Sequence, residues 1–263
     1  MNLIQSERQR GLQGLVATGD VKMNWSPDVM ERRAPFGIQP VAENRIWGML
    51  LGLAIGDSLG NTTEGQLPSN RRERYGEVRD YLPNRYADNR RVGVPSDDTQ
   101  LTFWMLEHLI EKGQIEPSAL ADLFESHRIF GVGKTTQKFV DAIRAGKPWL
   151  EATQQSAGNG ALTRIPATLL PHIVRGSEDL WVDVVLGTAV THNDWAAIGA
   201  SIAFVAILAE LLTMNSPPER GWWVDRFVRF AGPIEGENNP LKPRGGPVCT
   251  EYSIRHGRRE QTG

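Results

Sequence analysis

The sequence predicts an all-α fold. Several segments of the 263-residue chain carry apolar residues at the three- and four-residue spacing of a helix, whereas the alternating pattern of a half-buried strand is scarce. The length is enough for one large domain or two small ones, and length alone does not choose between them. A sizeable buried core is therefore expected.

The N-terminal residues 1–41 are expected to form an extension with at most short helices, because three prolines interrupt any long one. Residues 1–20 lack the continuous apolar core of a signal peptide. Cys249 is the single cysteine, which excludes an internal disulfide and a cysteine-based structural zinc site. These features favour a cytoplasmic protein.

Residues 46–55 are apolar nearly all round and predict a buried helix. Gly48, Gly52 and Gly56 recur at every fourth position, which would let another backbone approach closely. The same spacing marks membrane helix pairs, but this run is about half the ~20 residues that span a bilayer. A buried helix of a globular domain is therefore favoured.

The next segment, residues 71–91, is rich in arginine and other polar residues and predicts a long exposed loop. A well-marked helix follows, with Leu101 and Met105 on its apolar face and Gly113 placed to end it. Further helices are predicted at residues 117–130, 136–145, 161–174 and 179–190.

Residues 195–214 are the most apolar stretch and predict a central core helix. Ser201 and Glu210 interrupt the stretch, and no basic flank follows closely, which disfavours a membrane span. Aromatic residues between 222 and 230 predict one last amphipathic helix. Proline, glycine and charge dominate residues 232–263, so an irregular C-terminal tail is expected there.

The charge balance disfavours polyanionic partners. The chain has 29 Lys and Arg against 31 Asp and Glu, a formal net charge of −2, and therefore no overall basic field to attract nucleic acid or anionic lipid. We expect a small-molecule or protein partner, with no nucleic acid and no membrane.

The segment Ser96-Asp97-Asp98-Thr99 stands at the start of the helix that Gly113 ends. One interpretation is structural: Asp97 is the N-cap, Gln100 is its capping-box partner, and the helix dipole favours an acid in the first turn. The other is a hard-cation site, because a hydroxyl and two adjacent carboxylates supply the oxygen ligands that Mg²⁺ prefers. The two interpretations are compatible.

Asp57 and Glu64 follow the first apolar helix, in and after Gly56-Asp57-Ser58-Leu59-Gly60. A structural interpretation makes this a helix C-terminus with Gly60 in a left-handed conformation and Glu64 on a solvated turn. A functional one aims Glu64 into a cleft, where it could orient a substrate hydroxyl or a water.

The segment Gly131-Val132-Gly133-Lys134-Thr135-Thr136 fails the spacing of a nucleotide-binding phosphate loop, because Arg128 occupies the position of the first glycine and no strand precedes it. A glycine-rich turn that opens a helix still presents free backbone N–H groups and can hold a diphosphate. An ordinary interhelical turn is the alternative.

Two further segments combine turns with helix starts. Gly158-Asn159-Gly160, continuing as Ala161-Leu162-Thr163-Arg164, permits either close approach of a ligand or a tight turn. Thr191-His192-Asn193-Asp194 precedes the most apolar helix, where a histidine is by default a cap or a hydrogen-bonded buried group.

Together these motifs resemble the ADP-ribosylglycohydrolase family, which includes the enzyme that reactivates dinitrogenase reductase. The resemblance covers about residues 46–214 and rests on GDSLG with Glu64, then SDDT, GVGKTT, GNGALTR and THND, of which SDDT and GNGALTR are the most specific. It implies a compact orthogonal multi-helix domain over residues 42–231, a pair of Mg²⁺ ions, with Mn²⁺ as an alternative, and hydrolysis of the bond linking ADP-ribose to a protein side chain or small leaving group.

The resemblance also implies roles for individual residues. It makes Ser96, Asp97 and Asp98 metal ligands, and Glu64, Asp97 and Asp98 catalytic acids near the reacting ribose. The implied substrate-binding residues are Asp57, Gly131, Gly133, Gly158, Asn159, Gly160 and His192.

The sequence departs from the family pattern at one place, so membership of the family does not by itself imply its activity. Members of the family carry a second metal motif, Asp-x-Asp-Thr, near the C-terminus, and this chain has no aspartate after Asp225. The domain is therefore expected to be incomplete: the chain is truncated or altered at its end, another chain completes the site, or the protein binds ADP-ribose or a nucleotide without efficient catalysis. A purely structural helical protein is the third hypothesis.

Overall fold

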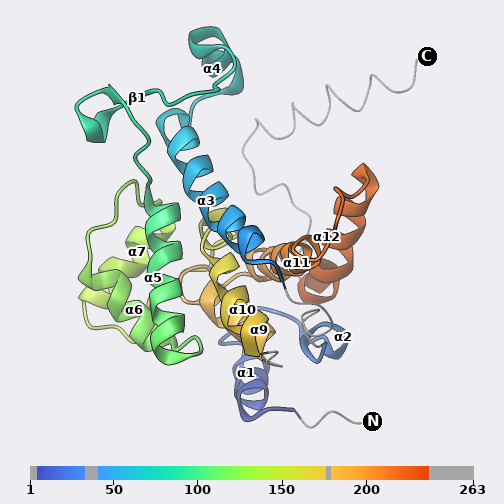
Figure 1. Cartoon of the computed structure of the whole chain (residues 1–263). Helices are drawn as coiled ribbons and strands as arrows, with labels where there is room; N and C mark the ends of the chain where they lie inside the picture. Colours follow the sequence, from blue (N-terminus) through green and yellow to red (C-terminus); the bar gives the residue numbers. More distant parts are fainter. Residues whose placement is uncertain (1–4, 33–40, 176–178, 237–263) are drawn as a thin grey trace, which may run out of the picture.

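The computed structural model describes residues 5–32, 41–175 and 179–236, and within them it confirms the all-α fold (Figure 1). The elements are α1 (Glu7–Ala17), α2 (Pro27–Met30), α3 (Glu43–Gly60), η1 (Asn61–Thr63), α4 (Pro68–Tyr75), β1 (Pro83–Asn84), η2 (Arg85–Ala87), β2 (Arg90–Arg91), α5 (Asp97–Lys112), α6 (Pro117–Ser126), α7 (Lys134–Arg144), α8 (Trp149–Ala152), η3 (Asn159–Ala161), η4 (Ile165–Thr168), α9 (Leu169–Arg175), α10 (Leu180–Ala189), α11 (Trp195–Leu211) and α12 (Arg220–Glu235).

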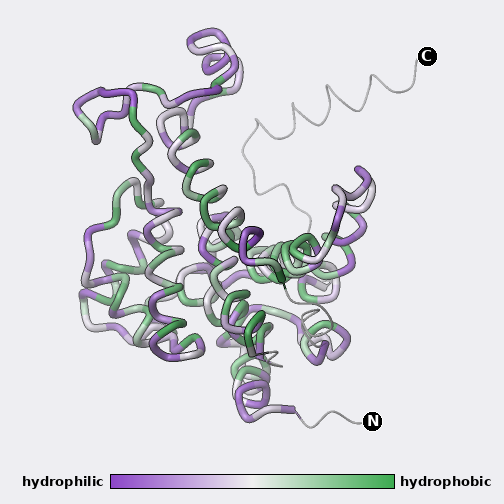
Figure 2. Tube along the Cα trace, in the orientation of Figure 1, coloured by the Kyte–Doolittle hydropathy of each residue, from purple (hydrophilic) through white to green (hydrophobic). Residues whose placement is uncertain are grey.

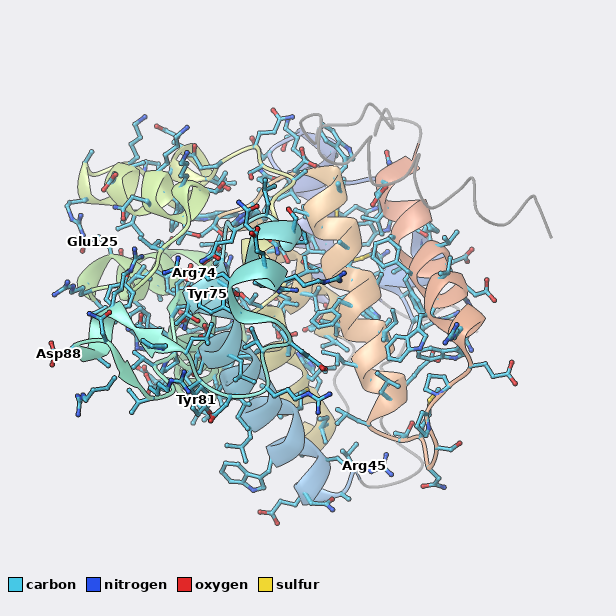
Figure 3. All side chains as sticks on the ribbon, turned by 90° about the horizontal axis from the view of Figure 1, so that it is seen from above. Arg45, Arg74, Tyr75, Tyr81, Asp88 and Glu125 are labelled. Atoms are coloured by element: carbon cyan, nitrogen blue, oxygen red, sulfur yellow. The ribbon has the colours of Figure 1, made fainter. Side chains whose placement is uncertain are left out.

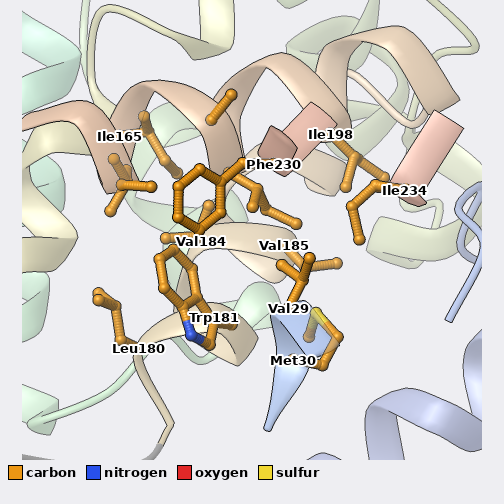
Figure 4. Close-up of a cluster of buried hydrophobic side chains, with 14 of the residues drawn as sticks. Val29, Met30, Ile165, Leu180, Trp181, Val184, Val185, Ile198, Phe230 and Ile234 are labelled. Carbon is orange, nitrogen blue, oxygen red and sulfur yellow. The ribbon is translucent and has the colours of Figure 1, made fainter. Parts of the chain in front are cut away.

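The larger of two hydrophobic cores is built around α10 and α11, which carry the hydrophobic colouring of Figure 2 along most of their length. The prediction of a central core helix is confirmed, because α11 buries residues on all sides. Figure 4 shows Trp181 of α10 against Phe230 of α12, with ring centroids 6.3 Å apart. The indole N–H of Trp181 donates to the carbonyl oxygen of Arg32 at 2.7 Å, so this large side chain is buried with its polar atom paired.

The second core joins α5, α6, α7 and α8. Leu101, Met105 and Leu109 face it from α5, as the helical spacing predicts. Gly113 ends α5 with a φ of 76°, and its N–H donates to the carbonyl oxygen of Leu109. This left-handed C-terminal glycine is the predicted one.

The described part of the N-terminal segment packs into the larger core rather than lying apart from it. Leu12 of α1 and Met30 of α2 are almost completely buried there. Arg8 also forms an ion pair with the buried Asp183 of α10 at 2.7 Å. At the other end, residues 232–235 of the expected tail continue α12, while residues 237–263, with Cys249, lie outside the described residues.

The prediction that residues 46–55 form a buried helix is right about the helix and wrong about its burial. Trp47, Leu51 and Ile55 of α3 are 54%, 54% and 48% exposed. A β-carbon placed on any of the three helical glycines, Gly48, Gly52 and Gly56, would meet nothing within 4 Å. The apolar composition of a helix indicates that its surface can pack against another surface, but it does not say which one. No described part of the chain covers this side of α3.

Most of residues 71–91 are exposed, as predicted, but they are not an irregular loop. They contain most of α4 and a hairpin in which β1 pairs antiparallel with β2, Pro83 opposite Arg91 and Asn84 opposite Arg90. Asp88 and Asn89 make the turn with φ values of 55° and 58°, a conformation that Asp and Asn tolerate better than most residues. In Figure 1 this region extends from the C-terminal end of α3, away from both cores.

None of the helices in the described ranges is both long enough and apolar enough to cross a membrane.

Candidate functional site

The first turn of α5 is held by an aspartate from another helix. Asp57, near the end of α3, accepts hydrogen bonds from the backbone N–H of Ser96 at 2.7 Å and from its hydroxyl at 2.6 Å. It also accepts from the N–H of Thr99 at 3.2 Å and from the Thr99 hydroxyl at 2.6 Å. Asp57 therefore satisfies free N–H groups at the start of α5 that no side chain of the N-cap satisfies.

The expected capping box is wrong. Ser96, not Asp97, is the N-cap of α5, and Asp97 is the first helical residue. The Gln100 side chain accepts from the N–H of Phe130 at 2.7 Å instead of bonding back to the cap. The alternative with Gly60 in a left-handed conformation is also wrong, because Gly60 has a φ of −84° and the chain continues into η1.

Asp97 and Asp98 are adjacent carboxylates in a partly buried position. Burial, followed by the charge of Asp98, raises the pKa of Asp97 to about 6, against the effect of a hydrogen bond from the Gly133 N–H at 3.3 Å. Burial and the charge of Asp57 raise the pKa of Asp98, opposed by Thr163 and by the positive charge of Arg164. Two acids whose charged forms are disfavoured attract a cation or a proton.

The glycine turn before α7 lies directly against these acids. Gly131 has a φ of 74°, and a β-carbon there would lie 3.2 Å from Cβ of Ser96 and 3.5 Å from Oδ1 of Asp97. Gly133 is the N-cap of α7, as the predicted helix-opening turn requires. A side chain at Gly131 would crowd Ser96 and strain the left-handed backbone, so glycine suits this close approach of the turn to the acidic pair.

The second glycine turn packs on His192. A β-carbon on Gly160 would lie 3.1 Å from Cε1 of His192, and one on Gly158 would lie 3.5 Å from Nε2. His192 is 3% exposed, and its Nδ1 lies 2.7 Å from the Thr191 hydroxyl. Burial, and then the charge of Arg164, lowers the pKa of His192 to about 3, so the imidazole is neutral at pH 7.

Arg164 connects the second glycine turn through hydrogen bonds to the end of α10 and the segment that follows it. It is completely buried, and its guanidinium donates to the carbonyl oxygens of Gly160 at 3.0 Å and Gly187 at 3.1 Å and to the Thr191 hydroxyl at 2.5 Å. Burial lowers the pKa of Arg164 to about 10, against the charges of Asp97 and Asp98, so it stays charged at neutral pH. The sequence motif contains Arg164, but its positioning role was not predicted.

A cavity of about 180 Å³ brings most of these residues together. Of the residues predicted from the sequence, it is lined by Glu64, Asp97, Asp98, Gly133, Gly158, Asn159, Gly160 and His192. Ser96, Asp57 and Gly131 do not line it and instead support its wall. The other lining residues are Lys134, Thr135, Thr136 and Thr163, which belong to the sequence motifs but were given no individual role. The first three belong to the first turn of α7, where a helix N-terminus already predicts anion binding.

A larger apolar groove of about 660 Å³ adjoins this cavity, between α3 and α11. Met49 and Leu53 line it from α3, and Phe204 and Leu208 from α11. Asp98 lines both the groove and the acidic cavity. Asp98 is therefore reached from two sides, and Asp97 from the acidic cavity.

The donor chemistry fits a hard divalent cation in part. Ser96, Asp97 and Asp98 offer a hydroxyl and two carboxylates, the oxygen donors that such ions prefer. The Ser96 hydroxyl gives its proton to Asp57, which leaves its lone pairs available. In the described ranges no group of three or more His, Cys, Asp and Glu side chains is arranged to hold a metal ion. The remaining ligands of a six-coordinate ion would come from water, from substrate hydroxyls or from another protein group.

The fold is all-α, and its candidate site combines two adjacent acids with two glycine turns. Comparison with known proteins identifies the family that has this combination. The family model for ADP-ribosylglycohydrolase matches residues 39–232. The chain therefore belongs to the ADP-ribosylglycohydrolase family.

Named relatives agree with this assignment. The chain is 30% identical over 166 residues to ADP-ribosylarginine hydrolase Tri1 of Pseudomonas putida, which covers 58% of this chain and 42% of the relative. It is 29% identical over 161 residues to ADP-ribosyl-[dinitrogen reductase] glycohydrolase of Rhodospirillum rubrum, covering 59% and 53%. A solved structure described as an ADP-ribosylglycohydrolase-related protein complex superposes with a TM-score of 0.51 and 26% identity, covering 65% of this chain and 57% of that one. The chain spans about half the length of the curated relatives it matches.

Proposed function

We propose that the acidic cavity binds ADP-ribose and that the chain hydrolyses, with a divalent metal, the glycosidic bond joining ADP-ribose to a protein side chain or small leaving group. The observation that carries the proposal is that one cavity is lined by Asp97, Asp98, both glycine turns and His192. The names of two relatives, an ADP-ribosylarginine hydrolase and a glycohydrolase for ADP-ribosylated dinitrogen reductase, support this substrate class.

The first turn of α7 is the proposed diphosphate site. Its N-cap is Gly133, and Lys134, Thr135 and Thr136 of this turn line the cavity. A helix N-terminus combines free N–H groups with the positive end of the helix dipole, and both favour a phosphate. The ammonium of Lys134 adds a positive charge that opposes the nearby acids.

Ser96, Asp97 and Asp98 are the residues that would hold the cation, Mg²⁺ or, as the alternative, Mn²⁺. Such an ion supplies Lewis acidity, which orients ribose hydroxyls and makes a bound water more acidic. Because Asp57 fixes Ser96 and Thr99, the three donors sit on a preorganised turn rather than on a mobile loop.

The remaining steps belong to side chains of the chain itself. Glycosidic bond cleavage places positive charge on the ribose ring, which nearby carboxylates stabilise. Glu64 is exposed and lines the cavity. It would hold the proton of an attacking water or of a substrate hydroxyl. His192 is neutral and can orient the substrate by hydrogen bonding without adding charge.

The second candidate is a module that binds ADP-ribose or a related nucleotide without efficient turnover. It is favoured by the donor count, because the three proposed metal ligands, Ser96, Asp97 and Asp98, are fewer than a two-metal clamp requires. In this case the glycine turns and His192 would keep their binding role, and the acids would act only as a weak cation site.

Calorimetry with ADP-ribose, with and without Mg²⁺, run beside an assay for ADP-ribose release, tests both candidates. The hydrolase requires Mg²⁺-dependent release that is lost in Asp97→Ala and Asp98→Ala but retained in Asp141→Ala, an exposed control on α7. The binding module gives ADP-ribose binding without release. Metal-dependent release that is unchanged in both site variants would show that the assignment is wrong.

A further inference from the structure

A positively charged region stands beside the cavity. We call residues 68–91, from α4 through the hairpin, the basic arm. It holds seven arginines against four acids, although the whole chain has a net charge of −2. All eleven of these side chains belong to exposed residues. Figure 3 shows Arg74 and Tyr75 on α4 and Asp88 at the tip of the hairpin.

The arginines of the basic arm are largely unneutralised. Among the residues that the structure describes, Arg79 alone of the seven forms an ion pair, with Glu77 at 2.7 Å. Arg85 instead lies 4.8 Å from the Tyr86 ring centroid and donates to the Tyr86 hydroxyl at 2.8 Å. That contact uses one of the five guanidinium N–H donors and leaves the others for a ligand.

The basic arm forms one side of a second cavity, of about 470 Å³. Arg85, Tyr86 and Asn89 line it from the arm, and Asn61 and Glu64 line it from the end of α3 and the turn that follows. Glu64 is the residue common to this cavity and the acidic one. A group leaving the ribose beside Glu64 therefore has a polar space to occupy, with Arg85 at its edge.

The arm is fastened to the acidic site by amide side chains. Asn84 is 1% exposed; it accepts from the N–H of Tyr86 at 2.8 Å and donates to the side chain of Asn61 at 3.3 Å. Asn61 in turn donates to Asp57 at 3.2 Å and to the carbonyl oxygen of Val94 at 2.6 Å. The same Asp57 fixes the start of α5, so this chain of hydrogen bonds holds the hairpin in a defined position relative to the acidic turn. Little conformational entropy of the hairpin is therefore lost when a ligand binds.

We propose, on the basis of the function proposed above, that the macromolecular substrate is a protein whose ADP-ribosylated side chain lies in an acidic stretch. The ADP-ribose occupies the acidic cavity, the modified side chain passes Glu64 into the second cavity, and flanking Asp or Glu residues pair with Arg85, Arg90 and Arg91. Such exposed ion pairs act mainly on selectivity and weaken with salt.

The test uses the full chain and two ADP-ribosylated peptides of one length, identical except that the modified residue is flanked by acidic or by basic residues. Fluorescence anisotropy gives the ratio of their affinities. The wild type should bind the acidic peptide about tenfold more tightly at low salt, and the ratio should approach one in 0.5 M salt. Replacing Arg85, Arg90 and Arg91 together with Ala should remove most of the preference.

The matched control replaces Arg10, Arg144 and Arg220 with Ala, three exposed arginines outside the basic arm, and changes the net charge equally. It should keep the wild-type ratio. Equal affinities of the two peptides for a wild type that binds free ADP-ribose would overturn this inference alone. Failure to bind either peptide or free ADP-ribose would overturn the proposed function as well. A last competition experiment adds unmodified single-stranded RNA or the unmodified acidic peptide to the bound ADP-ribosylated acidic peptide. If the RNA displaced it at the lower concentration, the basic arm would be a nucleic-acid site and the proposal of a protein partner would be overturned.

Discussion

The carboxylate of Asp57 binds both the backbone N–H and the hydroxyl of Ser96, at 2.7 and 2.6 Å, so that the end of α3 caps the start of α5. The side chain of an ordinary N-cap residue bonds within its own helix, whereas Asp57 bonds to the start of a different helix and so joins α3 and α5 at the acidic turn. The relative position of Asp97 and Asp98 therefore depends on a residue that lies outside the cavity they line.

Asp57→Asn should destabilise the protein and loosen the acidic turn. An amide keeps one acceptor oxygen, but its NH₂ group cannot accept from Ser96 or Thr99, and unsatisfied groups then remain at a helix start. We expect a loss of about 2 kcal/mol in the free energy of unfolding, measured by urea denaturation. Asp122→Asn, an exposed change on α6, is the control and should lie within about 0.5 kcal/mol of the wild type. Equal stabilities of the two variants would contradict the capping role.

Gly131→Ala and Gly146→Ala form a matched pair, because both glycines have positive φ values, 74° and 82°. Each change costs about 1 kcal/mol through the left-handed backbone. A β-carbon at Gly131 also meets Cβ of Ser96 at 3.2 Å, whereas one at Gly146 meets nothing within 4 Å. Gly131→Ala should therefore be the less stable variant in thermal melts and should bind ADP-ribose more weakly, while Gly146→Ala keeps wild-type affinity.

Asp183→Asn should make the free energy of unfolding less dependent on pH in the acidic range. Burial alone raises the pKa of Asp183, but the hydrogen bond with His172 and the charge of Arg8 outweigh it, so the pKa lies below its ordinary value. A lowered pKa in the folded state stabilises the protein above the unfolded pKa, about 3.9, and this contribution is lost as the pH falls through the folded value.

The difference in unfolding free energy between wild type and Asp183→Asn should therefore be largest above about pH 5, about 3 kcal/mol, and should narrow below about pH 4. Denaturant titrations across this range measure it. Asp141→Asn, exposed on α7, should show a small difference at every pH. A difference for Asp183→Asn that widened in acid would contradict the sign of the pKa shift.

Arg164→Lys should disrupt the floor of the site although it keeps the charge. A lysine ammonium cannot reach the carbonyl oxygens of Gly160 and Gly187 and the Thr191 hydroxyl in the fork geometry of a guanidinium. We expect a loss of at least about 2 kcal/mol in stability and weaker ADP-ribose binding. Arg226→Lys, at a partly exposed ion pair with Glu210, is the control and should cost less than about 1 kcal/mol.

Local patterns in the sequence predicted the elements whose causes are local. The apolar spacing of α5 and the glycine after it predicted both its core face and its end. The glycine turn before α7 was likewise found from its composition. The predicted helix over residues 161–174 was less accurate: the chain forms η3, η4 and α9 there, and Pro166 stands near the start of η4, where its missing N–H is tolerated.

What the sequence did not predict depends on contacts between distant segments. The capping of α5 by Asp57 joins residues 39 positions apart, and the contacts of Arg164 with Gly187 and Thr191 join residues 23 and 27 apart. Short-range spacing contains no information about such pairs. The choice of cap and the buried arginine therefore emerged only from the folded chain, and the metal ligands stay a prediction.

One side of α3 is covered by no residue that the structure describes, and this affects how the protein is expected to behave in solution. Trp47, Leu51 and Ile55 present large apolar surfaces to water over a helix whose glycines leave room for close contact. Contact between apolar surfaces strengthens as temperature rises from the cold, since the attraction is entropic. We therefore expect the protein to self-associate more strongly on warming than in the cold, through a surface outside the acidic cavity, and light scattering at the two temperatures measures this.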